Sequence, residues 1–244
     1  METYLQETSL LDFNHPSIKQ LVAARGWKEF NDYDKIGAAY NFVQNEITFG
    51  YNRADDIPAS AVLHDGYGQC NTKGTLLMAL LRALDVACRF HGFTIDKHLQ
   101  KGAITGLAYW LAPKSIVHSW VEVWYQDHWV NLEGFILDTA YLCSLQAQFS
   151  EVEGAFCGYG VAVSDFKNPS VMWQGRNTYI QVEGINHDYG VFSNPDTFYN
   201  KHGGNLRGFK ALVYKHVIRH QMNTNVQRIR DRGKTNAGTV AGAV

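Results

Sequence analysis

The sequence has few cysteines, and none of them stands in a metal-binding or disulfide pattern. The four cysteines, at positions 70, 88, 143 and 157, include no CxxC pair and no Cys/His zinc spacing. Four cysteines in 244 residues make no disulfide framework either. We therefore assign no metal and no cofactor, and we expect Cys88, Cys143 and Cys157 to pack in the core.

The sequence also lacks a long apolar run and an excess of one charge. Its 22 Lys and Arg nearly balance its 23 Asp and Glu, so no net field attracts nucleic acid or anionic lipid. No stretch reaches the roughly 18 apolar residues of a membrane span, and residues 1–14 lack the basic and apolar regions of a secretory signal. We expect a cytoplasmic protein without nucleic-acid or membrane partners, and its oligomeric state stays open.

Apolar and aromatic residues are abundant. Hydrophobic residues make up 45% of the chain, which includes 13 Phe, 13 Tyr and 6 Trp, enough for a large core. Because no linker-like change of composition occurs, we predict one domain over residues 1–232, with a catalytic core at about 33–140 and a C-terminal extension at about 141–232. Residues 233–244 are small and polar, which predicts a disordered tail.

The order of periodic segments predicts an α+β fold. Helices come first and an antiparallel sheet follows, instead of the alternation that builds parallel sheets. Leucines at helical spacing predict a helix over residues 72–84 that buries one face. The other predictions are two helices within 16–49, a loop over 50–68, strands at 88–94, 117–125, 129–133 and 179–183, and a helix at 206–230.

Cys70 stands out from the other cysteines because of its surroundings. Gly66 and Gly68 precede it and let the backbone approach a ligand closely, and the leucine-rich helix follows it. A thiolate at a helix N-terminus is stabilised by the helix dipole. The free N–H of Cys70 at that terminus can also stabilise the oxyanion of a tetrahedral intermediate. We predict that Cys70 is a nucleophile.

His118 is the predicted base. It lies on the strand His118-Ser119-Trp120-Val121-Glu122-Val123-Trp124, which would hold its imidazole rigidly against the start of the helix. In Cys–His enzymes the histidine takes the thiol proton and returns it to the leaving amine.

A carboxylate that orients His118 is expected on the return strand of a hairpin, and the turn length decides which one. A two-residue turn after Tyr125 makes Glu133 the diagonal neighbour of His118, within reach of its long side chain. A three-residue turn shifts the register by one and favours Asp138. We predict Glu133 and keep Asp138 as the alternative, because Asp138 follows the end of the strand. Glu122 lies on the same strand as His118 and is interpreted as structural.

These motifs together resemble the transglutaminase-like superfamily. Together they match the family's Cys, His and Asp motifs in order over about residues 50–138. The segments that carry the resemblance are residues 55–60, Gly68-Gln69-Cys70, the leucine-rich helix up to residue 82, Arg89-Phe90, residues 118–123 and residues 129–133. The resemblance implies a papain-like core, with the nucleophile at a helix N-terminus packed on an antiparallel sheet. The chain departs from the pattern at Glu133, where the family usually has Asp.

The resemblance also implies a second oxyanion donor on the segment before the cysteine. In this chain the candidates are Tyr51, Asn52 and Gln69, since each side chain can donate a hydrogen bond.

The sequence therefore predicts a cysteine-dependent hydrolase of amide or peptide bonds that acts through an acyl-enzyme on a peptide or a small amide or thioester. Acyl transfer to an amine, as in amide-bond formation, is the alternative, because both reactions share the acylation half. The resemblance favours hydrolysis, since small single-domain members are more often peptidases or amidases. A catalytically silent binding module is the alternative from another class.

Overall fold

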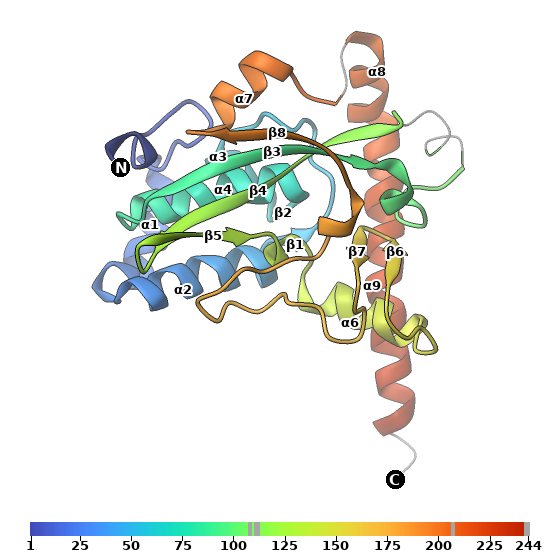
Figure 1. The fold of residues 1–244 in the computed structure, drawn as a ribbon. Coiled ribbons are helices and arrows are strands. Elements are labelled where there is room, and N and C mark those ends of the chain that lie inside the picture. Colours follow the sequence, from blue (N-terminus) through green and yellow to red (C-terminus); the bar gives the residue numbers. More distant parts are fainter. Residues whose placement is uncertain (107–108, 110–112, 206–207, 242–244) are drawn as a thin grey trace.

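The protein is described here from a computed structural model, which covers residues 1–106, 109, 113–205 and 208–241. A layer of helices packs on one face of a four-stranded antiparallel sheet, and a long C-terminal helix stands at one end of both layers (Figure 1). The fold is α+β, as predicted.

The elements follow one another in a simple order. The helices are α1 (Pro16–Ala24), α2 (Asp32–Asn45), α3 (Ala59–Asp65), α4 (Cys70–Ala83), α6 (Thr139–Gln148), α7 (Pro195–His202), α8 (Gly208–Val213) and α9 (Arg219–Ala241). The strands are β1 (Thr48–Phe49), β2 (Tyr67–Gly68), β3 (Cys88–Asp96), β4 (Ser115–Tyr125), β5 (His128–Leu132), β6 (Phe156–Gly158), β7 (Val161–Val163) and β8 (Ile185–Phe192).

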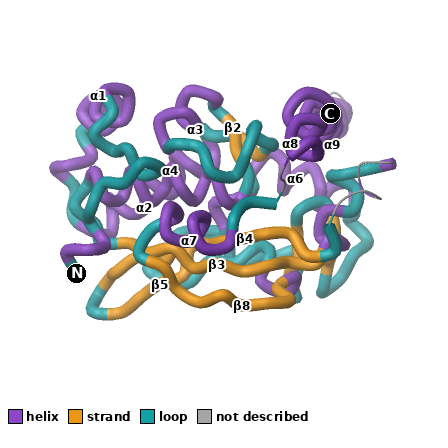
Figure 2. The backbone as a smooth tube through the Cα atoms, turned by 90° about the horizontal axis from the view of Figure 1, so that it is seen from above, coloured by secondary structure: helices purple, strands orange, loops and turns teal. Residues whose placement is uncertain are grey.

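The main sheet has the strand order β5-β4-β3-β8, and every neighbouring pair is antiparallel. Seen from above, the strands form one layer, and α1, α2, α3 and α4 lie on the same side of it (Figure 2). β1 and β2 pair separately and in parallel, and β6 and β7 form a small antiparallel ribbon. Strand β4, which carries His118, is therefore an inner strand, flanked on both sides.

The central helix α4 is buried on all sides, whereas the leucine spacing predicted only one buried face. Every residue from Cys70 to Arg82 is buried. The leucine face fills the core, and the polar side chains on the other faces form hydrogen bonds, although the buried Arg82 Nε has no partner among the described residues. Lys73 Nζ donates to the carbonyls of Gln44 and Ile136 at 3.2 and 2.9 Å, and Arg82 donates to three backbone carbonyls. Burying such groups requires these partners, so α4 is also held by its polar contacts.

The hairpin between β4 and β5 has the two-residue turn on which the prediction of Glu133 depends. Tyr125 pairs with His128, and the turn residues Gln126 and Asp127 have φ of 47° and 61°. Two consecutive residues in the left-handed region form the turn type that matches the twist of a hairpin.

Two predicted segments differ from the structure. The predicted loop 50–68 contains the short helix α3, which was missed because only seven residues are helical and turn residues flank them. The strand predicted at 179–183 is irregular backbone that leads into a 3-10 helix (Val182–Gly184), and the strand β8 follows it, with Gly190 and only a weak alternation of apolar residues. Helices α6 and α7 were not predicted.

The C-terminal helix is longer than predicted. α8 continues through a π-helical turn (Tyr214–Ile218) into α9, which runs to Ala241 and so crosses most of the segment predicted to be disordered. Gly233 marks the close crossing of α9 over α6, because a Cβ there would lie 2.7 Å from Ser144 Cβ. The helix therefore continues through Gly233, where it packs closely on Ser144 of α6. No helix in the described part of the chain is long and apolar enough to cross a membrane.

Candidate active site

Cys70 is the first residue of α4, and local hydrogen bonds shape the turn that leads into it. Gln69 is the N-cap, and its backbone N–H donates to Thr72 Oγ1 at 3.1 Å in a capping box. Gly68 approaches the helix too closely for a side chain, since a Cβ would lie 2.7 Å from Thr72 Oγ1 and 2.9 Å from Lys73 Cγ. This glycine therefore serves the tight entry into α4, whereas the sequence suggested that it approaches a ligand. The Cys70 side chain stays at the N-terminus of the helix, 8% exposed.

Asn71 connects the start of α4 to the strand that carries His118. Its Nδ2 donates to Val117 O at 3.1 Å, and its Oδ1 accepts from Ser119 Oγ at 2.9 Å. These two residues flank His118 in β4. Asn71 is buried, so water does not compete for its two hydrogen bonds, and they fix β4 relative to α4.

His118 is held by Glu133, as the hairpin register predicted. His118 Nε2 and Glu133 Oε1 lie 2.8 Å apart, and both side chains are fully buried. The other carboxylate oxygen, Oε2, accepts hydrogen bonds from the backbone N–H groups of Ile180 and Gln181 at 2.8 and 2.9 Å. With both oxygens bound, the carboxylate has one orientation, and it fixes the imidazole ring in turn.

The second ring nitrogen of His118, Nδ1, is the one available to interact with Cys70. It is buried and makes no ordinary hydrogen bond with any residue that the structure describes. Burial lowers the pKa of His118, but its interactions with Cys70 and with Glu133 raise it by more, so that the pKa is about 9. At neutral pH the ring therefore holds a proton, as the histidine of a Cys–His pair requires.

The other two carboxylates considered have different partners. Asp138 caps α6 by accepting from Tyr141 N at 2.9 Å, and its Oδ2 lies 2.6 Å from Arg230 Nη2. It therefore does not bond to His118. Glu122 is bound by Arg89 Nε and His91 Nδ1, each at 2.5 Å, in agreement with a structural role.

The three candidate oxyanion donors are placed differently. Gln69 and Tyr51 line the same cleft as Cys70. Gln69 Nε2 donates one hydrogen to Asp55 Oδ1 at 3.1 Å, and Tyr51 Oη donates to Gln100 Oε1 at 2.5 Å. Asn52 does not fit the role, because its Nδ2 donates to Asp65 Oδ2 and Tyr67 O, at 2.9 and 3.0 Å, and the residue is fully buried.

Of the cysteines expected in the core, only Cys88 is there. Cys143 and Cys157 are exposed, since Cys143 lies on the outer face of α6 and Cys157 points outward from β6. Within the described residues, no three His, Cys, Asp or Glu side chains gather in a way that could hold a metal ion.

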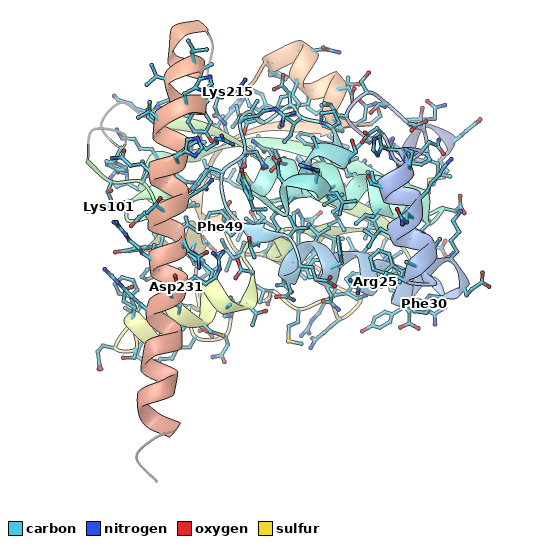
Figure 3. The ribbon with its side chains drawn as sticks, turned by 180° about the vertical axis from the view of Figure 1, so that it is seen from behind. Arg25, Phe30, Phe49, Lys101, Lys215 and Asp231 are labelled. Carbon is cyan, nitrogen blue, oxygen red and sulfur yellow. The ribbon has the colours of Figure 1, made fainter. Side chains whose placement is uncertain are left out.

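A cleft of about 600 Å³ opens beside Cys70. The C-terminal helix forms one side of it. Figure 3 shows this helix from behind, with Lys215 near its upper end and Asp231 farther down, and the helix continues past Asp231 to Ala241. The cleft is large enough for a small-molecule or peptide ligand.

Comparison with known proteins relates one segment of the chain to a family. Residues 22–134 match the model of the Transglutaminase-like superfamily. The chain carries a transglutaminase-like superfamily domain. The matched segment includes Cys70, His118 and Glu133 and ends directly after Glu133.

Two solved structures are similar to the chain that carries this transglutaminase-like domain. One is a protein proposed to be a cysteine protease from Cytophaga hutchinsonii, at 13% identity and a TM-score of 0.44, with 79% of this chain and 47% of that one covered. The other is red sea bream transglutaminase, at 14% identity and a TM-score of 0.32, with 95% and 40% covered. The match thus spans less than half of each solved chain. No curated protein matches the sequence significantly.

Several residues of the site lie outside the matched domain, and sequence reasoning missed them. Ile180 and Gln181 hold Glu133 through their backbone N–H groups, which any residue type supplies, so the sequence carries no signal for them. Tyr214 lines the cleft from the C-terminal helix. Asn71 was also missed, although a polar residue directly after the nucleophile in a leucine-rich helix could have indicated a buried hydrogen bond.

Proposed function

We propose that the protein is a cysteine-dependent hydrolase of amide or peptide bonds. The observation that supports this best is the fully buried hydrogen bond between Glu133 and His118, which leaves His118 Nδ1 for the Cys70 thiol at the start of α4. A carboxylate, an imidazole and a nucleophile in this order are the arrangement of triad enzymes.

The reaction follows from the positions of these groups. The Cys70 thiolate attacks the substrate carbonyl, and the oxyanion is stabilised by the N–H of Cys70 together with the second Nε2 hydrogen of Gln69, because the one hydrogen of Tyr51 Oη is donated to Gln100. His118 gives its proton to the leaving nitrogen, so the carbon–nitrogen bond breaks and an acyl-enzyme remains. Water then attacks the thioester while His118 accepts its proton, and the acid leaves as the thiolate is restored.

Alkylation tests the nucleophile. Iodoacetamide at pH 6 should modify Cys70 faster than the exposed Cys143, although Cys143 is more accessible, because only Cys70 has a paired imidazolium. His118→Ala should remove the difference. Equal rates at the two cysteines, with no effect of His118→Ala, would leave a catalytically silent binding module as the better description.

An amine distinguishes hydrolysis from acyl transfer. The wild-type protein is incubated with an acyl donor, with and without a primary amine at high concentration, and the products are quantified. We expect the acid product to be undiminished by the amine. A transamidated product that replaces the acid would show that the acyl-enzyme reacts with amines instead.

A further inference from the structure

The C-terminal helix presents one continuous apolar stripe, and its two halves have different neighbours. Val226 and Ile229 belong to the hydrophobic core, where they are buried. Tyr214, Ile218 and Met222 continue the same stripe at a spacing of four residues, and all three line the cleft beside Cys70. Val226 and Ile229 therefore contact the core and do not line the cleft, whereas Tyr214, Ile218 and Met222 pack against the core and also line the cleft.

A π-helical turn (Tyr214–Ile218) lies where the helix lines the cleft, and Val213, directly before the turn, lines the cleft as well. Such turns inside α-helices are rare and occur often at functional sites. Ile104, Ile116 and Val117 add apolar surface to the lining of the cleft.

The helix is fixed relative to Cys70 by polar contacts with the segment before the cysteine loop. Asn223 Oδ1 accepts from Tyr51 N at 2.7 Å, and Asn223 Nδ2 donates to Tyr51 O at 3.1 Å. Tyr214 Oη donates to Asn52 O at 3.1 Å. These bonds make the helix a fixed wall of the cleft.

Polar residues also line the cleft, and two of them, Gln69 and Asn71, flank Cys70 in the sequence. Asp55 accepts from the amides of both, at 3.1 and 3.2 Å, and Asn71 gives its other hydrogen to Val117 O. A substrate carbonyl at Cys70 would thus meet the N–H of Cys70 and the second Nε2 hydrogen of Gln69, while the rest of its acyl group would meet the apolar helix wall. The volume of about 600 Å³ exceeds what a small acyl group such as acetyl could fill.

We propose that the acyl group transferred to Cys70 carries a bulky apolar substituent, which binds against Tyr214, Ile218 and Met222 of the C-terminal helix. This proposal rests on the proposed function, because it names the substrate class of the same site. Each methylene that the wall buries improves binding about fourfold, so the acyl chain length should control the rate.

The test compares p-nitrophenyl acetate with p-nitrophenyl octanoate as acyl donors. We expect kcat/KM of the wild type to be at least tenfold higher for the octanoyl ester. Ile218→Trp, which fills the cleft, should reduce the octanoyl-to-acetyl ratio at least tenfold. Val217→Trp is the matched control, because Val217 is 60% exposed on the outer side of the same turn and should leave the ratio unchanged. Equal rates for the two esters, or a ratio that Ile218→Trp does not change, would overturn the proposal.

A binding measurement separates this proposal from the proposed function. Calorimetry with octanoate and the Cys70→Ala protein should show binding that Ile218→Trp abolishes, and thermal unfolding confirms that the variant is folded. Ile218→Ala, which enlarges the cleft, should favour longer chains and provides a second variant. Octanoate binding without any Cys70-dependent turnover would reject the proposed function only. Turnover without a chain-length preference would reject only the specificity proposed here.

Discussion

Replacing Glu133 by Gln tests the central contact of the site with little change of shape. The glutamine carbonyl oxygen can still accept from the N–H groups of Ile180 and Gln181, which now bond to Glu133 at 2.8 and 2.9 Å. The amide nitrogen then faces His118 Nε2 and donates to it. This bond requires the ring proton to sit on Nδ1, so His118 in its neutral form has no lone pair left for the Cys70 thiol.

The size of the effect follows from that change of tautomer. The equivalent carboxylate-to-amide change in serine proteases lowers kcat by about 10⁴-fold. We expect Glu133→Gln to lower Cys70-dependent turnover by about 10³-fold to 10⁴-fold. The pH profile should move too, because Glu133 helps to raise the pKa of His118 to about 9. The wild type needs the imidazolium and loses activity as the pH rises through about 9, and the variant should lose it at a lower pH.

The assay is kcat/KM of wild type and variant from pH 5 to 10 with the same acyl donor, with Glu151→Gln as a control for a change at an exposed carboxylate. Urea unfolding of both proteins checks that the loss is not a loss of folding. The reasoning fails if Glu133→Gln retains more than a tenth of the activity with the same alkaline limit.

Three further predictions concern positions around the site. Burial lowers the pKa of Lys73 to about 7, so the folded state binds fewer protons than the unfolded state between about pH 7 and 10, and stability increases with pH there. Lys73→Met should remove this increase, changing the stability difference from wild type by about 4 kcal/mol between pH 6 and 10 in urea unfolding, whereas a constant difference would contradict it. Asp138→Asn should cost about 3 to 5 kcal/mol at pH 7, because Arg230 stays buried without its partner. Arg230 holds the pKa of Asp138 below its ordinary value despite burial, so this cost should shrink as the pH falls below about 4, and calorimetry at both pH values would show it. Asn71→Ala should lower kcat by up to about 100-fold with a smaller change in KM, by loosening β4 from α4, and unchanged steady-state kinetics would show that Asn71 does not position His118.

Local patterns in the sequence were sufficient for the core of the site. The glycines and leucines around Cys70 mark a turn followed by a helix, and both signals depend only on near neighbours. The hairpin is equally local, because the short connection after Tyr125 sets the register and the register selects Glu133. The α+β order of elements, the helix of Cys70 and the pairing of His118 with Glu133 were therefore predictable.

Contacts between distant residues decided the rest. The amides of Ile180 and Gln181 that hold Glu133 come from irregular backbone, which has no periodicity to detect. Asn52 is a suitable donor by residue type, but its hydrogens are bound to Asp65 and Tyr67 in the folded chain. Exposure of Cys143 likewise depends on which face of α6 the core covers.

The sequence by itself determined that Cys70 begins a helix and that His118 pairs with Glu133, because helix termini and hairpin registers depend on short stretches of the chain. Only the tertiary structure showed that the C-terminal helix forms a wall of the cleft beside Cys70. Its apolar stripe has the same helical spacing throughout, and nothing in that spacing distinguishes the residues that contact only the core from those that also line the cleft. That distinction arises when α9 crosses α6 and passes the end of the sheet, where long-range packing leaves space next to the thiol.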